Sequence, residues 1–258
     1  MSRNLTSVWA CAACMLLASM LTGCAGVGLD GRRLDIHGLN NAIVFDDVDY
    51  VRAAVKSGAV GINQRIPAPG YAEGTPIITI AAKSASLNIL RYLITAGANV
   101  NARTPVNETP LMLAAFFYEE GRDNSAHSYD RHEKAVRMLV EAGASLENEA
   151  YHYTPLAYAA YQGHDRIVRF LLARGARVDA DAQDGMTYVN TPLMMAAIQG
   201  HRGTAQSLLR AGANPRIRIH RGHTAAELAV KYNHTHIFEL LKCAENVTAG
   251  EAFTRGCR

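Results

Sequence analysis

The feature that most constrains this chain is an internal repeat. A Thr-Pro pair recurs four times, and Thr-Ala takes its place in a fifth copy. Successive copies begin 34, 45, 37 and 33 residues apart, at Thr75, Thr109, Thr154, Thr191 and Thr224. Self-similarity with a period of roughly 20–50 residues is the signature of repeat architectures. We therefore expect stacked units, each of which contacts its neighbours, rather than elements arranged around one central core.

Each copy has the pattern of two short helices. Thr is a good helix cap, and Pro is tolerated in the first turn, where its missing N–H leaves no bond unmade. In the first four copies an Ala pair lies inside this first segment, and the second segment ends in an apolar pair followed by Gly-Ala. Glycine there can adopt the left-handed conformation that ends a helix. The Gly-Ala pairs are Gly97-Ala98, Gly143-Ala144, Gly175-Ala176 and Gly212-Ala213.

The repeat resembles the ankyrin repeat, whose period is about 33 residues and whose signature is T-P-L-H-x-A. The resemblance implies an all-α ankyrin-repeat solenoid over residues 42–243, with a C-terminal tail over 244–258. We expect about five to six helix-turn-helix repeats joined by hairpin-like fingers, and degenerate terminal repeats, the first ending near Gly58-Ala59. The histidine of the signature is missing, which is expected to weaken local hydrogen bonding; Met112, Ala157, Met194 and Glu227 stand there.

The N-terminus resembles a bacterial lipoprotein signal. An apolar run follows a short start that contains Arg3, and it ends in Leu21-Thr22-Gly23-Cys24, which matches a lipobox. The resemblance implies a signal peptide over residues 1–23, a lipidated (palmitate-bearing) Cys24 and a flexible tether over 24–41. Because Ala25 and not Asp follows the cysteine, it also implies attachment to the outer membrane, facing the periplasm. The alternative is an ordinary cleaved signal with a chance cysteine.

Two cysteines remain once the signal is removed and Cys24 is lipidated. Cys243 and Cys257 form an even pair in an oxidising compartment, where disulfides persist. We predict a bridge that pins the tail to the last helix. The alternative is two unpaired thiols.

Composition and motifs favour a binding protein over an enzyme. The net charge of +3 is too small for a general nucleic-acid binder. No catalytic motif occurs, and the pairs His220/His223 and His234/His236 lack further ligands at metal spacing. We expect no catalytic residue, metal, cofactor, nucleic acid or small-molecule substrate.

In the ankyrin family, partners usually bind the concave side, which is made of inner-helix ends and finger tips. The register places aromatic and polar residues there, the types that dominate interface hot spots. The predicted protein-binding residues are Phe117, Tyr151, Tyr153, Tyr161, Gln162, Tyr188, Gln199, Arg221 and Tyr232. Phe116 and Phe117 have an alternative role as fillers between repeats. Two insertions, near residues 118–131 and 185–190, serve either as recognition loops or as tolerated surface loops.

The leading hypothesis for function is therefore a lipid-anchored protein of the bacterial cell envelope that binds a protein partner. By analogy of fold and location, it resembles immunity proteins of type VI secretion, which block an incoming toxin such as a phospholipase effector. The alternative is a periplasmic scaffold that supports an envelope or oxidative-stress enzyme.

Overall fold

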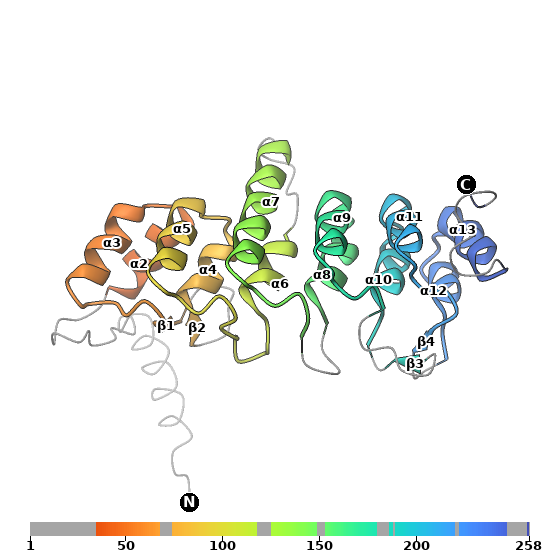
Figure 1. Cartoon of the computed structure of the whole chain (residues 1–258), viewed down its shortest axis with the longest axis horizontal. Helices are drawn as coiled ribbons and strands as arrows, with labels where there is room; N and C mark the ends of the chain where they lie inside the picture. The colour runs from red at the N-terminus through yellow and green to blue at the C-terminus, as the bar shows by residue number, and fades with distance from the viewer. Residues whose placement is uncertain are drawn as a thin grey trace, which may run out of the picture.

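The computed structural model describes residues 35–67, 74–117, 125–148, 153–179, 186–187, 189–219, 222–246 and 257. Within these residues the helices form six pairs, which stand side by side in chain order from α2 to α13 (Figure 1). The short strands and the loops between pairs lie along one edge of this row (Figure 1). The expected all-α repeat array is confirmed. No helix in this part of the chain is long and apolar enough to cross a membrane.

One helix of each pair is an inner helix and the next is an outer helix. The inner helices are α2 (Ile36–Val44), α4 (Ile77–Lys83), α6 (Pro110–Ala115), α8 (Pro155–Gln162), α10 (Pro192–Gln199) and α12 (Ala225–Lys231). The outer helices are α3 (Val48–Lys56), α5 (Leu87–Thr95), α7 (Ser125–Glu141), α9 (Asp165–Ala173), α11 (Arg202–Arg210) and α13 (Thr235–Asn246). Inner helices pack on one another along the row, so that α10 contacts both α8 and α12.

The repeated Thr begins four of the inner helices as the sequence predicts. Each hydroxyl oxygen accepts a hydrogen bond from a backbone N–H of the first turn, as Thr154 does from Ala157 at 3.2 Å. The missing signature histidine is partly replaced. The backbone N–H of Thr224 donates to Glu227 at 2.9 Å, and that of Thr109 donates to the Met112 sulfur at 3.4 Å. The expected weakening of hydrogen bonding is therefore wrong for these two repeats.

The Ala pairs explain how the inner helices approach one another. Both members are fully buried in four repeats, namely Ala81-Ala82, Ala114-Ala115, Ala159-Ala160 and Ala196-Ala197. Their small side chains let neighbouring inner helices pack closely. Larger apolar residues of the outer helices, such as Leu90 and Leu171, close the core from the other side and are also fully buried. No pair buries these surfaces alone, which is why the array is continuous.

A side-chain ladder joins consecutive fingers. The fingers are the loops that join one helix pair to the next. In each finger except the last, a side-chain oxygen of Asn, Asp or Glu accepts a hydrogen bond from a backbone N–H of the following finger. This acceptor lies three residues after the Gly-Ala pair, or four residues after it in the first finger. The bonds run from Asn99 to Asn63 at 2.8 Å, Ser145 to Asn101 at 2.7 Å, Arg177 to Glu147 at 2.8 Å and Asn214 to Asp179 at 2.9 Å. Short strands add to this link. Strand β1 (Arg65–Ile66) pairs antiparallel with β2 (Thr75–Pro76), and β3 (Met186–Thr187) pairs parallel with β4 (Arg218–Ile219).

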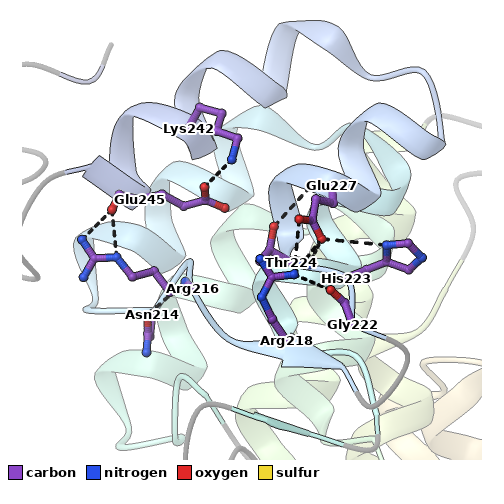
Figure 2. Close-up of polar contacts among 9 residues, drawn as sticks. All are labelled: Asn214, Arg216, Arg218, Gly222, His223, Thr224, Glu227, Lys242 and Glu245. Carbon is purple, nitrogen blue, oxygen red and sulfur yellow. Dashed lines mark hydrogen bonds and ion pairs between the residues drawn. The ribbon is translucent and has the colours of Figure 1, made fainter.

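The ladder ends at Arg216, where a cation replaces the acceptor. Its guanidinium Nε donates to the backbone carbonyl of Glu245 at 2.8 Å, near the end of α13 (Figure 2). A positive charge there complements the negative end of the helix dipole. The two cysteines expected to pair are joined by a disulfide, with the Cα atoms of Cys243 and Cys257 5.6 Å apart. Both features hold the C-terminal end against the last repeat.

Two predicted boundaries are wrong. The expected tether over 24–41 ends earlier, because α2 begins at Ile36 and Asp35 caps it by accepting from the Gly38 N–H at 2.9 Å. Its residues Leu39 and Ile43 are fully buried, four apart as one helical face requires. At the other end α13 continues past residue 243, and Ala244 is buried. Polar and Gly-rich composition concealed the first of these helix faces. Cys24 lies outside the described residues.

The first insertion is helical from residue 125 onward and lengthens α7. Its Tyr129 hydroxyl accepts from the Arg166 backbone N–H at 3.2 Å, and its Arg131 donates to the Ala85 carbonyl at 3.0 Å. This part of the insertion therefore packs on the preceding and following repeats. The segment 118–124 lies outside the described residues.

Candidate functional site

A hollow of about 490 Å³ opens across the inner helices α6, α8, α10 and α12. It is made where helix ends meet finger residues, and its walls are mainly aromatic. The lining residues are Phe116, Tyr153, Tyr158, Tyr161, Asn190, Met195, Ile198, Gln199 and Tyr232. Surface concavities with apolar walls and a few polar groups are the usual places for a ligand or a partner side chain.

The ring of Phe116 is the centre of the aromatic wall. Helix α6 stops at Ala115 and is two residues shorter than α8 or α10, and Phe116 follows it in a non-helical conformation. Its ring meets Tyr158 edge-to-face at 5.0 Å and lies 6.1 Å from the ring of Tyr161. Tyr153 meets Tyr158 edge-to-face at 6.2 Å. Such contacts fix the rings relative to one another, because the negative face of one attracts the positive edge of the next.

The tyrosine hydroxyl of Tyr158 lies beside a carboxylate. It donates to Glu108 Oε1 at 3.4 Å. Burial of the ring and the negative charge of Glu108 raise the pKa of Tyr158 to about 12. The hydroxyl is therefore neutral at physiological pH and stays a donor toward the carboxylate. This pair places a carboxylate beside a mainly aromatic wall.

Backbone contacts from neighbouring repeats position the other tyrosines. The Tyr153 carbonyl accepts from the Asn148 amide at 3.1 Å. The Tyr161 carbonyl lies 3.0 Å from His201 Nε2. Tyr232, at the end of α12, lines the hollow and is 48% exposed. The hollow is thus built on a scaffold of four repeats.

The structure brings together four of the predicted binding residues: Tyr153, Tyr161, Gln199 and Tyr232 all line the hollow. Gln162 ends α8 without lining it. Tyr151, Tyr188 and Arg221 lie outside the described residues.

The sequence reasoning missed Tyr158, Asn190 and Met195 as lining residues. A signal was available for Tyr158. It lies directly before the buried Ala pair, where the adjacent repeats carry Leu113 and Met195. An aromatic residue at this position of the repeat differs from the aliphatic residues of its neighbours. Such a difference indicates that packing between repeats does not alone determine the residue.

Phe117 does not line the hollow, and its burial contradicts the prediction that it is exposed for binding. It is only 5% exposed, and its ring lies between two imidazole rings. The centroid distances are 4.0 Å to His132 and 3.8 Å to His164, with planes 8° and 11° apart. The reason is the early end of α6, after which the chain turns Phe117 inward toward α7 and α9. Its alternative role as a filler between repeats is the one observed.

The two histidines that flank Phe117 act as structural side chains. His164 Nε2 lies 3.0 Å from the Phe117 carbonyl, and His132 Nδ1 lies 3.2 Å from the Ala114 carbonyl. Burial lowers the pKa of both imidazoles to about 4, so both are neutral at pH 7. In the described part of the chain, no group of three or more His, Cys, Asp or Glu side chains is placed to hold a metal ion.

Comparison with known families decides the identity of the array. A model described as "Ankyrin repeats (3 copies)" matches residues 124–184, and one described as "Ankyrin repeat" matches residues 74–105 and 190–219. The chain belongs to the ankyrin-repeat family. Ankyrin repeats imply that this protein binds another protein. The matched stretches contain α4, α5 and α7–α11, which supply much of the hollow's wall.

Two curated relatives share about a quarter of their aligned residues with this protein. A transient receptor potential cation channel subfamily A member 1 homolog from Caenorhabditis elegans is 27% identical over 114 residues, which is 44% of this chain and 8% of the channel. A putative E3 ubiquitin-protein ligase, XBAT31, from Arabidopsis thaliana is 27% identical over 139 residues, which is 53% of this chain and 27% of the ligase. The chain thus spans a small share of each relative.

Proposed function

We propose that this ankyrin-repeat protein is anchored by lipid in the bacterial envelope and inhibits one partner protein by holding it at the aromatic hollow. The observation that carries the proposal is the hollow itself. Tyrosine side chains dominate it, and tyrosine is among the residues that contribute most to binding at protein interfaces. A scaffold of four repeats holds these rings in place before binding, which reduces the entropy lost on association.

Two features support a location outside the cytoplasm. The lipobox-like Leu21-Thr22-Gly23-Cys24 supports lipid attachment at Cys24, and two or more acyl chains anchor stably. The Cys243–Cys257 disulfide supports an oxidising compartment such as the periplasm. Metabolic labelling with a palmitate analogue tests the anchor. Label on the wild type and none on Cys24→Ala is expected, and label that persists in Cys24→Ala contradicts the proposal.

Within this role, the narrower proposal is immunity to a secreted toxin such as a phospholipase effector delivered by type VI secretion. An inhibitor tethered to the membrane meets a membrane-attacking enzyme where that enzyme acts. Cells that lack the gene are expected to lose resistance to neighbours that carry the cognate toxin. Equal survival of both strains contradicts immunity.

The binding proposal is tested by capture of the tagged, full-length protein from membranes, with mass spectrometry of what is retained. One stoichiometric partner is expected with the wild type and is lost with Tyr161→Ala plus Tyr232→Ala. Tyr50→Ala is the matched control, because Tyr50 is a similarly exposed tyrosine on α3, outside the hollow. A toxin-like or lipase partner supports immunity. Capture of envelope-maintenance or antioxidant enzymes contradicts immunity and favours the scaffold role. Loss of the partner with Tyr50→Ala alone contradicts the hollow as the binding site.

A further inference from the structure

The residues that line the hollow are uncharged, but one of them contacts a carboxylate. Among the described residues, Glu108 is the only charged residue whose side chain is hydrogen-bonded to a side chain that lines the hollow, through the Tyr158 hydroxyl. The other polar lining groups are the neutral amides of Asn190 and Gln199 and the tyrosine hydroxyls. A ligand that enters therefore meets aromatic faces, neutral acceptors and one nearby carboxylate.

Elsewhere the protein places its own cations over aromatic rings of its outer helices. Arg166 lies 4.9 Å from the centroid of the Tyr129 ring. The Phe170 ring on α9 is covered twice, by Arg137 at 4.4 Å and by Arg174 at 4.6 Å. These pairs follow from the negative face of an aromatic ring, which attracts guanidinium groups most readily.

Three tyrosine rings of the hollow differ in this respect. No described cation of this chain lies over the ring of Tyr153, Tyr158 or Tyr161. Their faces are the negative ends of aromatic quadrupoles, and the Glu108 carboxylate adds to the same potential. Guanidinium suits such a site better than ammonium, because it is planar, stacks on rings and is weakly hydrated.

We infer that the hollow receives an arginine side chain from the protein partner, stacked on the tyrosine rings and drawn by the charge of Glu108. The inference rests on the proposed binding function and names the chemistry of the group that is bound. Burial is the main cause of the high pKa of Tyr158, and the negative charge of Glu108 adds to it. The same negative charge would attract a cation.

The test titrates the purified full-length protein with N-acetyl-arginine methylamide and with its neutral citrulline analogue. Methyl resonances of Met195 and Ile198, which line the hollow, report binding by NMR. Saturable shifts with at least about fivefold tighter binding of the arginine compound are expected, as one desolvated cation–π contact provides. In Glu108→Gln, which keeps an acceptor for Tyr158 but removes the charge, this preference is expected to vanish. Equal binding of the two compounds, or a preference unchanged in Glu108→Gln, overturns the inference.

Capture of the partner separates this inference from the binding proposal. If the partner is lost with Tyr161→Ala plus Tyr232→Ala but is retained at wild-type level by Glu108→Gln, the hollow binds protein and the arginine inference fails. If the partner is retained by both variants, the hollow is not the binding site and both the binding proposal and the arginine inference fail. Tenfold weaker capture with Glu108→Gln and correct folding by circular dichroism supports both.

Discussion

The ring of Phe117 lies flat against the ring of His164, with centroids 3.8 Å apart and planes 11° apart. The same imidazole reaches the Phe117 backbone, because Nε2 of His164 lies 3.0 Å from the Phe117 carbonyl. Phe117 follows α6 and His164 precedes α9, so the pair joins two consecutive repeats through one side chain and one backbone group. In a repeat array, where stability depends on contacts between neighbours, this pair is a point of strong coupling.

Replacement of Phe117 tests that coupling. Phe117→Ala removes a buried ring from between two imidazoles and is expected to lower the free energy of unfolding by about 3–5 kcal/mol. Tyr161→Ala, at the partly exposed wall of the hollow, is expected to lower it by about 1 kcal/mol or less. Urea denaturation followed by circular dichroism measures both. Similar small losses would mean that Phe117 is not a core residue.

The two buried histidines predict sensitivity to acid. Their pKa of about 4 in the folded protein lies below the ordinary 6.5, so between these values the unfolded chain binds more protons. The free energy of unfolding must then fall as the pH falls from 7 toward 4. The expected loss is about 1 kcal/mol per histidine between pH 7 and 5.5. Urea titrations at the two pH values measure it, and His164→Gln should show a smaller loss than the wild type. An identical loss in both proteins would contradict this assignment.

Asp179 is expected to change stability with pH in the opposite direction to the two histidines. Burial raises its pKa from 3.8 to about 6, although the Asn214 N–H lowers it. Stability from the protonated carboxyl is therefore present at low pH and lost as the pH rises through 6. Asp179→Asn keeps an oxygen acceptor for Asn214, as Asn101 does for Ser145 in an earlier finger. We expect a gain of about 1–2 kcal/mol at pH 8 that disappears by pH 4. A gain that is independent of pH would show that the charge is not its cause.

The repeat array could be predicted because its determinants are local. Thr caps, Ala pairs and Gly-Ala endings each act within a few residues, and five copies in register reinforce one another. The start of α2 was missed because its signal is weak. Leu39, Ala42 and Ile43 make a helical face, yet Gly38 and polar neighbours surround them. Burial on α4 supplies the stability that local propensity does not.

The candidate site could be predicted only in part. Register placed Tyr161, Gln199 and Tyr232 where they line the hollow, because those positions lie at the regular C-terminal ends of α8, α10 and α12. It failed for Phe117, because α6 ends early. The irregular turn that follows buries Phe117 and leaves Phe116 in the wall of the hollow. The contact between Tyr158 and Glu108 joins residues 50 positions apart. No periodicity in the sequence encodes such a pair.

The disulfide offers a test at the C-terminal end. Cys243→Ser with Cys257→Ser opens a loop of 14 residues, which is expected to lower the free energy of unfolding by about 3 kcal/mol. The melting temperature should fall by roughly 6–12 °C, and dithiothreitol should produce the same fall in the wild type. Dithiothreitol should leave the double variant unchanged. A melting temperature of the wild type that does not respond to the reductant would mean that the bridge adds no stability.

Gly163, at the turn between helices α8 and α9, is required both for its backbone conformation and for the space around it. A pair of substitutions can separate these two reasons. Gly163 has a φ of +74°, and a Cβ there would lie 2.5 Å from the His201 ring of the next repeat. Gly175, after α9, has a φ of +94°, but its Cβ would meet open space. Gly175→Ala therefore carries only backbone strain, of about 1 kcal/mol, whereas Gly163→Ala must also displace an imidazole.

That imidazole cannot move freely, because His201 Nε2 lies 3.0 Å from the Tyr161 carbonyl at the wall of the hollow. We expect Gly163→Ala to lower the free energy of unfolding by at least about 1 kcal/mol more than Gly175→Ala in urea denaturation. Gly163→Ala should also shift the Ile198 methyl resonance, whereas Gly175→Ala should not, because displacement of His201 disturbs the backbone that holds Tyr161. Equal losses of stability with an unshifted Ile198 resonance would mean that the His201 ring moves aside without cost, and that the contact between repeats does not position the hollow.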